Sequence, residues 1–287
     1  AQSLNGKSTG NVALVIANMA NPLIGVYGGG EEYALFDHQL NTLICNTKFK
    51  LDREVAYVNM LLSKQIDGII IAPCGDDNAH ILEIQRLGIP MVFLTRRVGG
   101  VEVDYIRFAN EEGSYNVVKH LLDIGHRRIA MIGRTVDRHS PTGRFTGYKM
   151  ALEKHGLPVD DKLLIFGETS QQFAYEATDY FISLKDRPTA VFTAVNIQAA
   201  GVIDYCRQNG VAIPEELALA AFESFSEFDT VMSPQLTANE MPLHELGVAA
   251  ANRLVDRIKG DPGPPETRSF CGELLVREST VGQSKEF

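Results

Sequence analysis

Arg144 is the residue of this chain with the clearest chemical potential, because it stands at the head of a predicted helix. Before it come the apolar run Ile129–Gly133, which is typical of a strand buried on both faces, and the polar loop Arg134–Thr142. Open α/β sheets bind ligands at the carboxyl ends of their strands, where such a loop lies. The arrangement predicts that Arg144 holds a small ligand, although it could instead form a salt bridge on the face of its helix.

No grouping of side chains typical of an enzyme accompanies this arginine. The seven histidines form no H-E-x-x-H pair, and His139-Ser140 is a loop dipeptide with no acid placed to orient the histidine. The glycine-rich stretch Gly25–Glu32 lacks the spacing and the lysine of a phosphate loop, which favours helix packing. The cysteines are scattered without C-x-x-C spacing, which favours buried thiols over a zinc site: Cys45, Cys74, Cys206 and Cys271. We therefore expect no catalytic activity, no metal and no cofactor.

Length, composition and charge set further limits. The 287 residues suffice for two lobes with separate cores, and 45% hydrophobic with 22% charged residues is typical of a globular protein. The net charge of −9 argues against nucleic-acid binding by general electrostatics, although a local basic patch could still bind it. The sequence shows neither a secretory leader nor an apolar run near the roughly 18 residues of a membrane helix. We expect a cytoplasmic protein without a membrane segment.

Strand and helix signals alternate along the first 110 residues. Apolar runs separated by short turns predict strands at Val12–Ala17, Asn41–Cys45, Asp67–Pro73, Met91–Thr95 and Tyr105–Phe108. Between them, helical spacing predicts helices at Leu23–Phe36, Arg53–Lys64 and Ala79–Leu87. Asp52 is expected to cap the second of these helices. Repeated strand–helix units of this kind predict a parallel sheet covered on both faces.

The same alternation restarts after Asn110. Predicted helices lie at Glu111–Ile124, Arg144–His155, Ser170–Leu184 and Ile197–Asn209, and strands at Ile129–Gly133, Leu163–Phe166, Ala190–Thr193 and Leu217–Phe222. The tail adds strands at Leu236–Asn239 and near Leu274–Val276, with a long helix at Leu243–Ile258. Two such series predict an α/β fold of two similar parallel-sheet lobes with crossovers between them. Ligands of such folds bind in the cleft between the lobes, which closes by hinge motion.

Several short segments carry a resemblance to a known family. They occur in this order: NPLIG (Asn21–Gly25), CNT (Cys45–Thr47), DGIIIAP (Asp67–Pro73), GIP (Gly88–Pro90), GHRRIAMIG (Gly125–Gly133), R-x-x-G-Y (Arg144–Tyr148), RPTAVF (Arg187–Phe192), SPQLT (Ser233–Thr237) and ELLVREST (Glu273–Thr280). In this order and spacing, the chain resembles the ligand-binding core of the lactose-repressor (LacI/GalR) family of transcription regulators over Ala1–Thr280. The resemblance implies a type I periplasmic-binding-protein-like fold.

The resemblance also implies a division of the chain. Residues 1–9 are expected to be a hinge-helix remnant or linker. Residues 10–109 with about 239–270 are expected to form the N-terminal lobe, and 110–238 with about 271–287 the C-terminal lobe. The family begins with a helix-turn-helix headpiece that this chain lacks, and Leu4 matches the hinge leucine that enters the minor groove. Alternatively, Ala1–Lys7 is a disordered stub in the absence of DNA.

The expected ligand pocket departs from the family pattern. Acids or amides usual in the family are replaced at Asn18, Thr95, Ala109 and Val195, while Arg144 is kept. The resemblance implies these ligand contacts: Arg144, Glu223, Asn196, Asn18, Leu23, Arg96, Asn110, Thr169 and Phe166. Asn110 and Asn196 could instead cap helices, and Arg96 could form an ion pair. The family suggests a sugar or sugar phosphate as ligand, and a purine or acidic metabolite paired with Arg144 is the alternative.

Two functions compete at this stage. The first is the effector-binding and dimerisation core of a repressor, in which a small molecule alters operator binding by the absent headpiece. A homodimer is expected because a two-fold protein matches near-palindromic operators. The second is a periplasmic sugar-binding protein of the same fold. The GHRRIA segment and the missing secretory leader favour the regulator.

Overall fold

A computed structural model of the chain describes residues 8–19, 21–75, 77–138, 143–224 and 232–281. The chain forms two compact units. Unit 1 comprises Ala1–Phe108 and Pro242–Phe270, and unit 2 comprises Ala109–Met241 and Cys271–Phe287. Each unit is an α/β sandwich around a mostly parallel sheet, as the sequence predicted. None of the described helices is both long and apolar enough to cross a bilayer.

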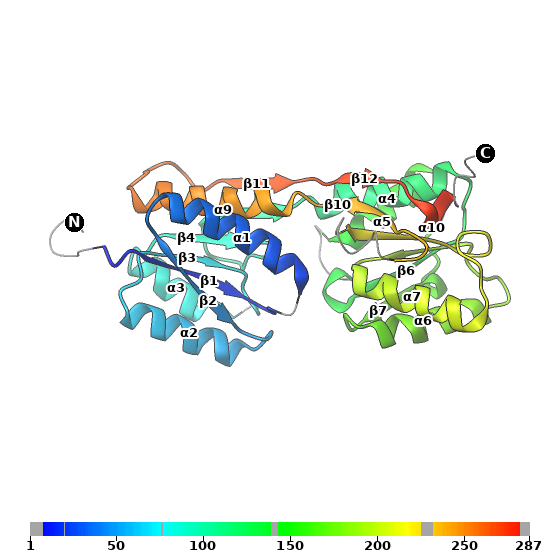
Figure 1. Cartoon of the computed structure of the whole chain (residues 1–287), viewed down its shortest axis with the longest axis horizontal. Helices are drawn as coiled ribbons and strands as arrows, with labels where there is room; N and C mark the ends of the chain where they lie inside the picture. Colours follow the sequence, from blue (N-terminus) through cyan, green and yellow to red (C-terminus); the bar gives the residue numbers. More distant parts are fainter. Residues whose placement is uncertain (1–7, 20, 76, 139–142, 225–231, 282–287) are drawn as a thin grey trace. The chain divides into compact units, whose positions relative to one another are not determined.

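Unit 1 holds a six-stranded sheet in the order β11-β5-β4-β3-β1-β2 (Figure 1). All of its strand pairs are parallel. The strands are β1 (Asn11–Ile16), β2 (Asn41–Asn46), β3 (Gly68–Ile71), β4 (Met91–Leu94), β5 (Asp104–Phe108) and β11 (Thr267–Phe270). Helices α1 (Pro22–Asp37) and α9 (Leu243–Ile258) cover one face, and α2 (Leu51–Ser63) and α3 (Ala79–Arg86) cover the other.

Close approach of α1 and α9 depends on two glycines. A Cβ on Gly30 would overlap the backbone carbonyl of His244, and one on Gly247 would overlap the carbonyl of Tyr27. The glycines of the stretch Gly25–Glu32 therefore act at least partly in helix packing, in agreement with the sequence-based interpretation. Because no side chain separates the two helices at these points, α9 packs closely on α1 although it comes late in the chain.

Unit 2 repeats this plan with the strand order β12-β10-β9-β8-β6-β7. Its strands are β6 (Ile129–Arg134), β7 (Leu164–Gly167), β8 (Ala190–Thr193), β9 (Ala218–Ser224), β10 (Thr237–Glu240) and β12 (Glu273–Leu275). Only the β10–β12 pair among the described strands is antiparallel. Helices α4 (Asn110–Asp123) and α5 (Arg144–Lys154) cover one face, and α6 (Gln171–Ser183) and α7 (Asn196–Asn209) cover the other (Figure 1). The short helix α10 (Glu278–Val281) follows β12.

Some predicted details of the elements are wrong. Asp52 does not cap α2, because that helix already begins at Leu51 and its N-cap residue is Lys50. Asp52 lies instead in the first turn, where a carboxylate is favoured by the helix dipole. Nothing in the sequence pattern indicated β11, whose polar TRSF segment pairs with β5 at the edge of the unit 1 sheet.

Candidate functional site

Three strand ends and three helix starts meet at the carboxyl edge of the unit 2 sheet. Strands β6, β8 and β9 are neighbours there, since β8 pairs with both β6 and β9. Helices α4, α5 and α7 begin at Asn110, Arg144 and Asn196. Parallel strands place their carboxyl ends at one edge of a sheet, so side chains at these positions converge although they are far apart in sequence.

Arg144 lies buried at the centre of this edge. Its Nη2 donates to Glu223 Oε1 at 2.7 Å, its Nη1 donates to the carbonyl of Ala194, and its Nε donates to Asn110 Oδ1 at 3.4 Å. The guanidinium carbon also lies 4.0 Å from the ring centre of Phe222. The structure thus brings together three predicted residues: Arg144, Glu223 and Asn110. Arg144 thus forms a salt bridge, as the alternative predicted, but the pair is buried rather than on an exposed helix face.

A second ion pair adjoins the first. Arg134, the last residue of β6, donates to the Asp137 carboxylate through Nε at 3.0 Å and through Nη2 at 2.7 Å. The backbone amide of Arg134 donates to the same carboxylate at 3.0 Å. Asp137 lies in the 3₁₀ turn Thr135–Arg138 and is buried. The sequence motifs do not single out this pair, although an arginine and an aspartate three residues apart at the end of a buried strand are a usable signal.

The charges of these four residues act on one another. Burial lowers the pKa of Arg144, the nearby Arg134 charge lowers it further, and Glu223 and Asp137 offset only part of this. Burial alone would raise the pKa of Asp137, but the bonds from Arg134 bring it below its ordinary value. For Arg134, the bond to Asp137 outweighs burial and raises the pKa. We call Arg134, Asp137, Arg144 and Glu223 the charged quartet.

The other predicted residues of unit 2 line the same edge less closely. Asn196 is the first residue of α7, and the N-cap residue of that helix is Val195. Likewise Ala109, not Asn110, is the N-cap residue of α4. The alternative that these asparagines cap helices is therefore wrong. Phe166 in β7 packs edge-on against the ring of Phe145 at 5.1 Å, and Thr169 is exposed in the turn before α6.

Gln198 is a further polar residue of this edge that the sequence did not single out. Its side chain is fully buried, and its Nε2 donates to the carbonyl of Glu168 at 3.2 Å and to that of Gly133 at 3.4 Å. It therefore ties the end of β6 to the turn before α6. Its Oε1, like Thr193 Oγ1 at the end of β8, has no hydrogen-bond partner among the described residues.

Unit 1 carries three predicted site residues near the carboxyl ends of its own strands. Asn18 follows β1, and its carbonyl accepts from the amide of Asn21. Leu23 is buried in the first turn of α1. Arg96 follows β4, is exposed, and donates through Nη1 to the carbonyl of Cys74 at 3.2 Å. The predicted DNA contact, Leu4, lies outside the described residues.

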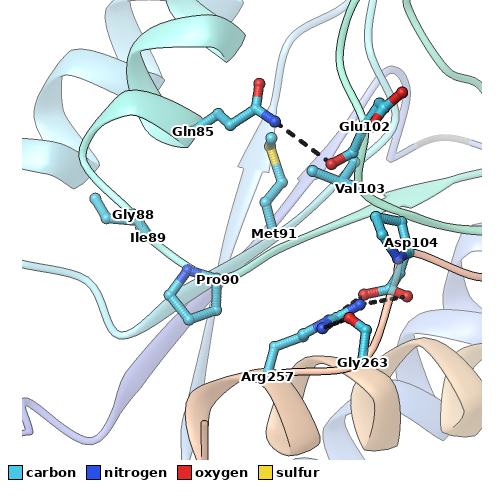
Figure 2. A pocket seen from close by; sticks show the side chains of 11 residues that line it. Gln85, Gly88, Ile89, Pro90, Met91, Glu102, Val103, Asp104, Arg257 and Gly263 are labelled. Atoms are coloured by element: carbon cyan, nitrogen blue, oxygen red, sulfur yellow. Dashed lines mark hydrogen bonds and ion pairs between the residues drawn. The ribbon is translucent and has the colours of Figure 1, made fainter. Parts of the chain in front are cut away.

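A pocket of about 290 Å³ occupies the opposite, amino-terminal edge of the unit 1 sheet. Ile89, Pro90 and Met91 line it before and at the start of β4, and Asp104 and Arg257 form another wall (Figure 2). Asp104 accepts from Nε and Nη2 of Arg257 at 2.6 and 3.3 Å, so these charges already neutralise each other. The pocket contains none of the predicted ligand contacts.

The part of the chain that the structure describes does not bring metal-binding side chains together. No cluster of three or more histidine, cysteine or acidic side chains could hold a metal ion there. The four cysteines, all described, are free thiols. Burial raises the pKa of Cys74 to about 11, so that thiol is poorly suited to act as a nucleophile at neutral pH.

Comparisons with known proteins agree with this architecture. A family model described as a periplasmic binding protein-like domain matches residues 118–280. The HTH-type transcriptional repressor PurR of Photobacterium profundum is 28% identical, covering 97% of this chain and 84% of that protein. Catabolite control protein A of Priestia megaterium is also 28% identical, covering 98% of this chain and 84% of that protein. The solved structure of a LacI family transcriptional regulator from Enterococcus faecium with bound ribose matches with a TM-score of 0.84 and 25% identity, covering 96% of this chain and 100% of that one.

Proposed function

Because this chain belongs to the periplasmic binding protein-like family and, within it, to the LacI/GalR transcriptional regulators, we propose that it is a repressor's effector-binding and dimerisation core. A small effector binds at the carboxyl edges of the sheets. Its binding alters how a DNA-binding domain that precedes this chain holds operator DNA. The two sites are coupled, so operator binding changes effector affinity by the same factor.

One observation carries the assignment of the site. Arg144, which the R-x-x-G-Y motif placed in the pocket, lies at the carboxyl edge of the unit 2 sheet within a group of buried charges. Buried ionic groups with perturbed pKa values are more frequent at binding sites than elsewhere. The proposed contacts in unit 2 are Arg144, Glu223, Asn110, Asn196, Phe166 and Thr169. Those in unit 1 are Asn18, Leu23 and Arg96.

A sugar or a sugar phosphate is the leading effector class. The ribose bound in the regulator from Enterococcus faecium supports a sugar, because that protein has the same fold over nearly its whole length. The loss of acids and amides at Thr95, Ala109 and Val195 means that the hydroxyl pattern recognised here differs from that of common relatives. A purine or an acidic metabolite paired with Arg144 is the second candidate.

The proposed assembly is a homodimer. Helix α1 exposes a line of apolar side chains at Val26, Tyr33 and Phe36. Strand β2, at the edge of the unit 1 sheet, exposes Leu43 and Ile44. A hydrophobic edge strand beside an apolar helix face is unfavourable in water and is normally covered. A second copy of the chain, related by a two-fold axis, would cover it.

The partner of the dimer is operator DNA, reached through the preceding headpiece. The relative from Photobacterium profundum is named an HTH-type repressor, which supports such a domain here. Leu4 is the proposed hinge residue that enters the minor groove. DNA binding implies a cytoplasmic location, and the function includes no catalysis. A periplasmic sugar-binding protein is not favoured, since the relatives named above are transcription regulators.

The codons upstream of Ala1 provide the direct test. We expect them to encode a helix-turn-helix domain of about 60 residues, and a secretory leader in their place would overturn the proposal. A thermal-shift screen of sugars, sugar phosphates and nucleobases then tests the effector. A ligand at 100 times its dissociation constant stabilises the folded chain by about 2.7 kcal/mol.

A further inference from the structure

Arg134 is the most exposed member of the charged quartet. Its side chain is 32% exposed, whereas those of Asp137, Arg144 and Glu223 are 1%, 4% and 6% exposed. The quartet contains two positive and two negative groups, yet both carboxylates and one guanidinium are enclosed. The surface at the end of β6 is therefore cationic, although the group as a whole is neutral.

The geometry of Arg134 leaves one of its nitrogens available. Asp137 accepts from Nε and Nη2, the two donors on one edge of the guanidinium. Nη1 donates to none of the described residues, and it is not enclosed by protein atoms. Asp137 also accepts from the backbone amide of Arg134 and is itself buried, so the guanidinium is fixed in direction. A fixed donor loses little side-chain entropy on binding a ligand.

Electrostatics favour an anion at this place over a neutral group. The charge of Arg134 acts directly on Arg144 and lowers the pKa of that buried guanidinium. An anion bound at Nη1 would lie near both cations and would reduce their mutual repulsion. A neutral hydroxyl could accept the same hydrogen bond but would give no such compensation. Any hydrogen bond from the charged guanidinium is charge-assisted, so the preference for an anion comes from this reduction of the repulsion between the two cations.

We propose that Arg134 is an anion-binding residue of the effector site, with Nη1 donating to a carboxylate or phosphate group of the effector. Asp137 is a positioning residue that holds the guanidinium without contacting the ligand. This inference rests on the proposed function and narrows it from sugar-like effectors in general to those that carry an anionic group. It also adds a cation to the sequence-based assignment, which named Arg144 and Arg96 but not Arg134.

Four probes distinguish the chemical possibilities: inorganic phosphate, glucose 6-phosphate, gluconate and glucose. Their dissociation constants would be measured by titration calorimetry with the whole chain. We expect at least one anionic probe to bind the wild type at least tenfold more tightly than glucose. A preference for the two phosphates over gluconate would identify a phosphate site, and the reverse preference a carboxylate site.

A double variant, a conservative variant and a control then test the residue. Arg134→Gln leaves a buried carboxylate unpaired and could unfold the chain, so the double variant Arg134→Gln with Asp137→Asn is the main test. We expect it to bind the anion at least tenfold more weakly, with its melting temperature confirming that it is folded. Arg134→Lys keeps the charge but loses the paired donors of the guanidinium. Its affinity for the anion should therefore lie between that of the wild type and that of the double variant. Lys149→Gln, an exposed cation on α5, is the matched control and should bind within twofold of the wild type.

The inference is overturned if no anionic probe binds, or if the double variant retains its affinity for the anion. Glucose binding that is equal in the wild type and the double variant, without any anion binding, would remove the inference but leave the proposed effector function. Conversely, a secretory leader upstream of Ala1 would remove the regulator function and leave the role of Arg134 intact. The two failures are thus distinguishable.

Discussion

Arg144 at the head of α5 and Glu223 near the end of β9 form an ion pair of 2.7 Å that is almost fully excluded from solvent. The two residues are 79 positions apart in sequence. The ring of Phe222 lies against the same guanidinium, so the apolar surface that excludes water also contacts the cation. The interaction therefore contributes to both the packing of unit 2 and the charge of its carboxyl edge.

Removing one member of this pair should destabilise the chain strongly. Arg144→Ala leaves Glu223 buried without its partner, and breaking a buried pair in this way costs roughly 3–5 kcal/mol. Arg144→Met with Glu223→Leu removes both charges and should unfold at a denaturant concentration much closer to that of the wild type. Urea unfolding followed by circular dichroism measures both. If the single and double variants lose the same free energy of unfolding, the packing of unit 2 does not depend on this ion pair.

The same single variant tests the ligand contact. If Arg144 binds the effector, Arg144→Ala should lose most of the thermal shift that the effector gives the wild type. A full shift in a folded Arg144→Ala variant would contradict that role. This result would also strengthen the case for Arg134 as the cation that the ligand meets.

Glu31 should make stability fall with rising pH. Burial, with a smaller contribution from the charge of Glu32, raises its pKa to about 8 despite the opposing effect of the nearby Thr42 hydroxyl, and neither carboxyl oxygen has a hydrogen-bond partner of good geometry among the described residues. Between about pH 4.5 and pH 8 the unfolded chain releases this proton while the folded chain keeps it, so folding becomes less favourable as the pH rises. The loss should be on the order of a few kcal/mol, since each pKa unit corresponds to about 1.4 kcal/mol.

The neutral variant Glu31→Gln should remove this dependence. We expect it to match the wild type near pH 5 and to exceed the wild type in melting temperature near pH 8. Glu153→Gln, at an exposed position of α5, serves as the control and should follow the wild type at both pH values. Parallel pH profiles of Glu31→Gln and the wild type would mean that Glu31 ionises freely in the folded chain.

Two glycine-to-alanine substitutions in helices should change the stability of the chain in opposite directions. Gly247→Ala in α9 places a methyl group against the carbonyl of Tyr27, which cannot move without displacing α1. Overpacking of this kind typically costs about 1–3 kcal/mol. Gly28→Ala in α1 meets only Leu14 Cδ2 at 3.5 Å, an ordinary contact, and should stabilise by up to about 1 kcal/mol through helix propensity. Thermal unfolding distinguishes the two, and a stable Gly247→Ala variant would argue against the close approach of α1 and α9.

Charges on the exposed face of α1 should separate a dimer. Tyr33 and Phe36 are 61% and 72% exposed within one chain, and replacing both by aspartate would place two carboxylates in the proposed interface. Sedimentation at micromolar concentration should show a dimer for the wild type and a monomer for the double variant. Tyr180→Asp, at an exposed aromatic of α6 in unit 2, should leave the dimer intact. A wild-type monomer at this concentration would refute dimerisation.

Much of the fold and the neighbourhood of the site followed from sequence alone. Hydrophobic periodicity is a local property, so β8 and α9 were predicted with the observed bounds and most other elements within a residue or two. The placement of Arg144 beside a strand end also followed, because a strand, loop and helix in succession determine which end of the sheet the helix start faces. The family motifs added the identity of the fold.

The partners of the charged residues were decided only by the tertiary structure. Glu223 reaches Arg144 because β9 lies next to β8 and β8 next to β6, an order that does not follow from local sequence. The same applies to β11, whose polar segment becomes a strand because β5 offers it an unpaired edge. The sequence does not show that Arg134 is exposed and Arg144 is buried, because both are arginines that follow the same buried apolar run. Burial is a property of all the neighbours that folding assembles, and it determines which of the two cations is more exposed to solvent.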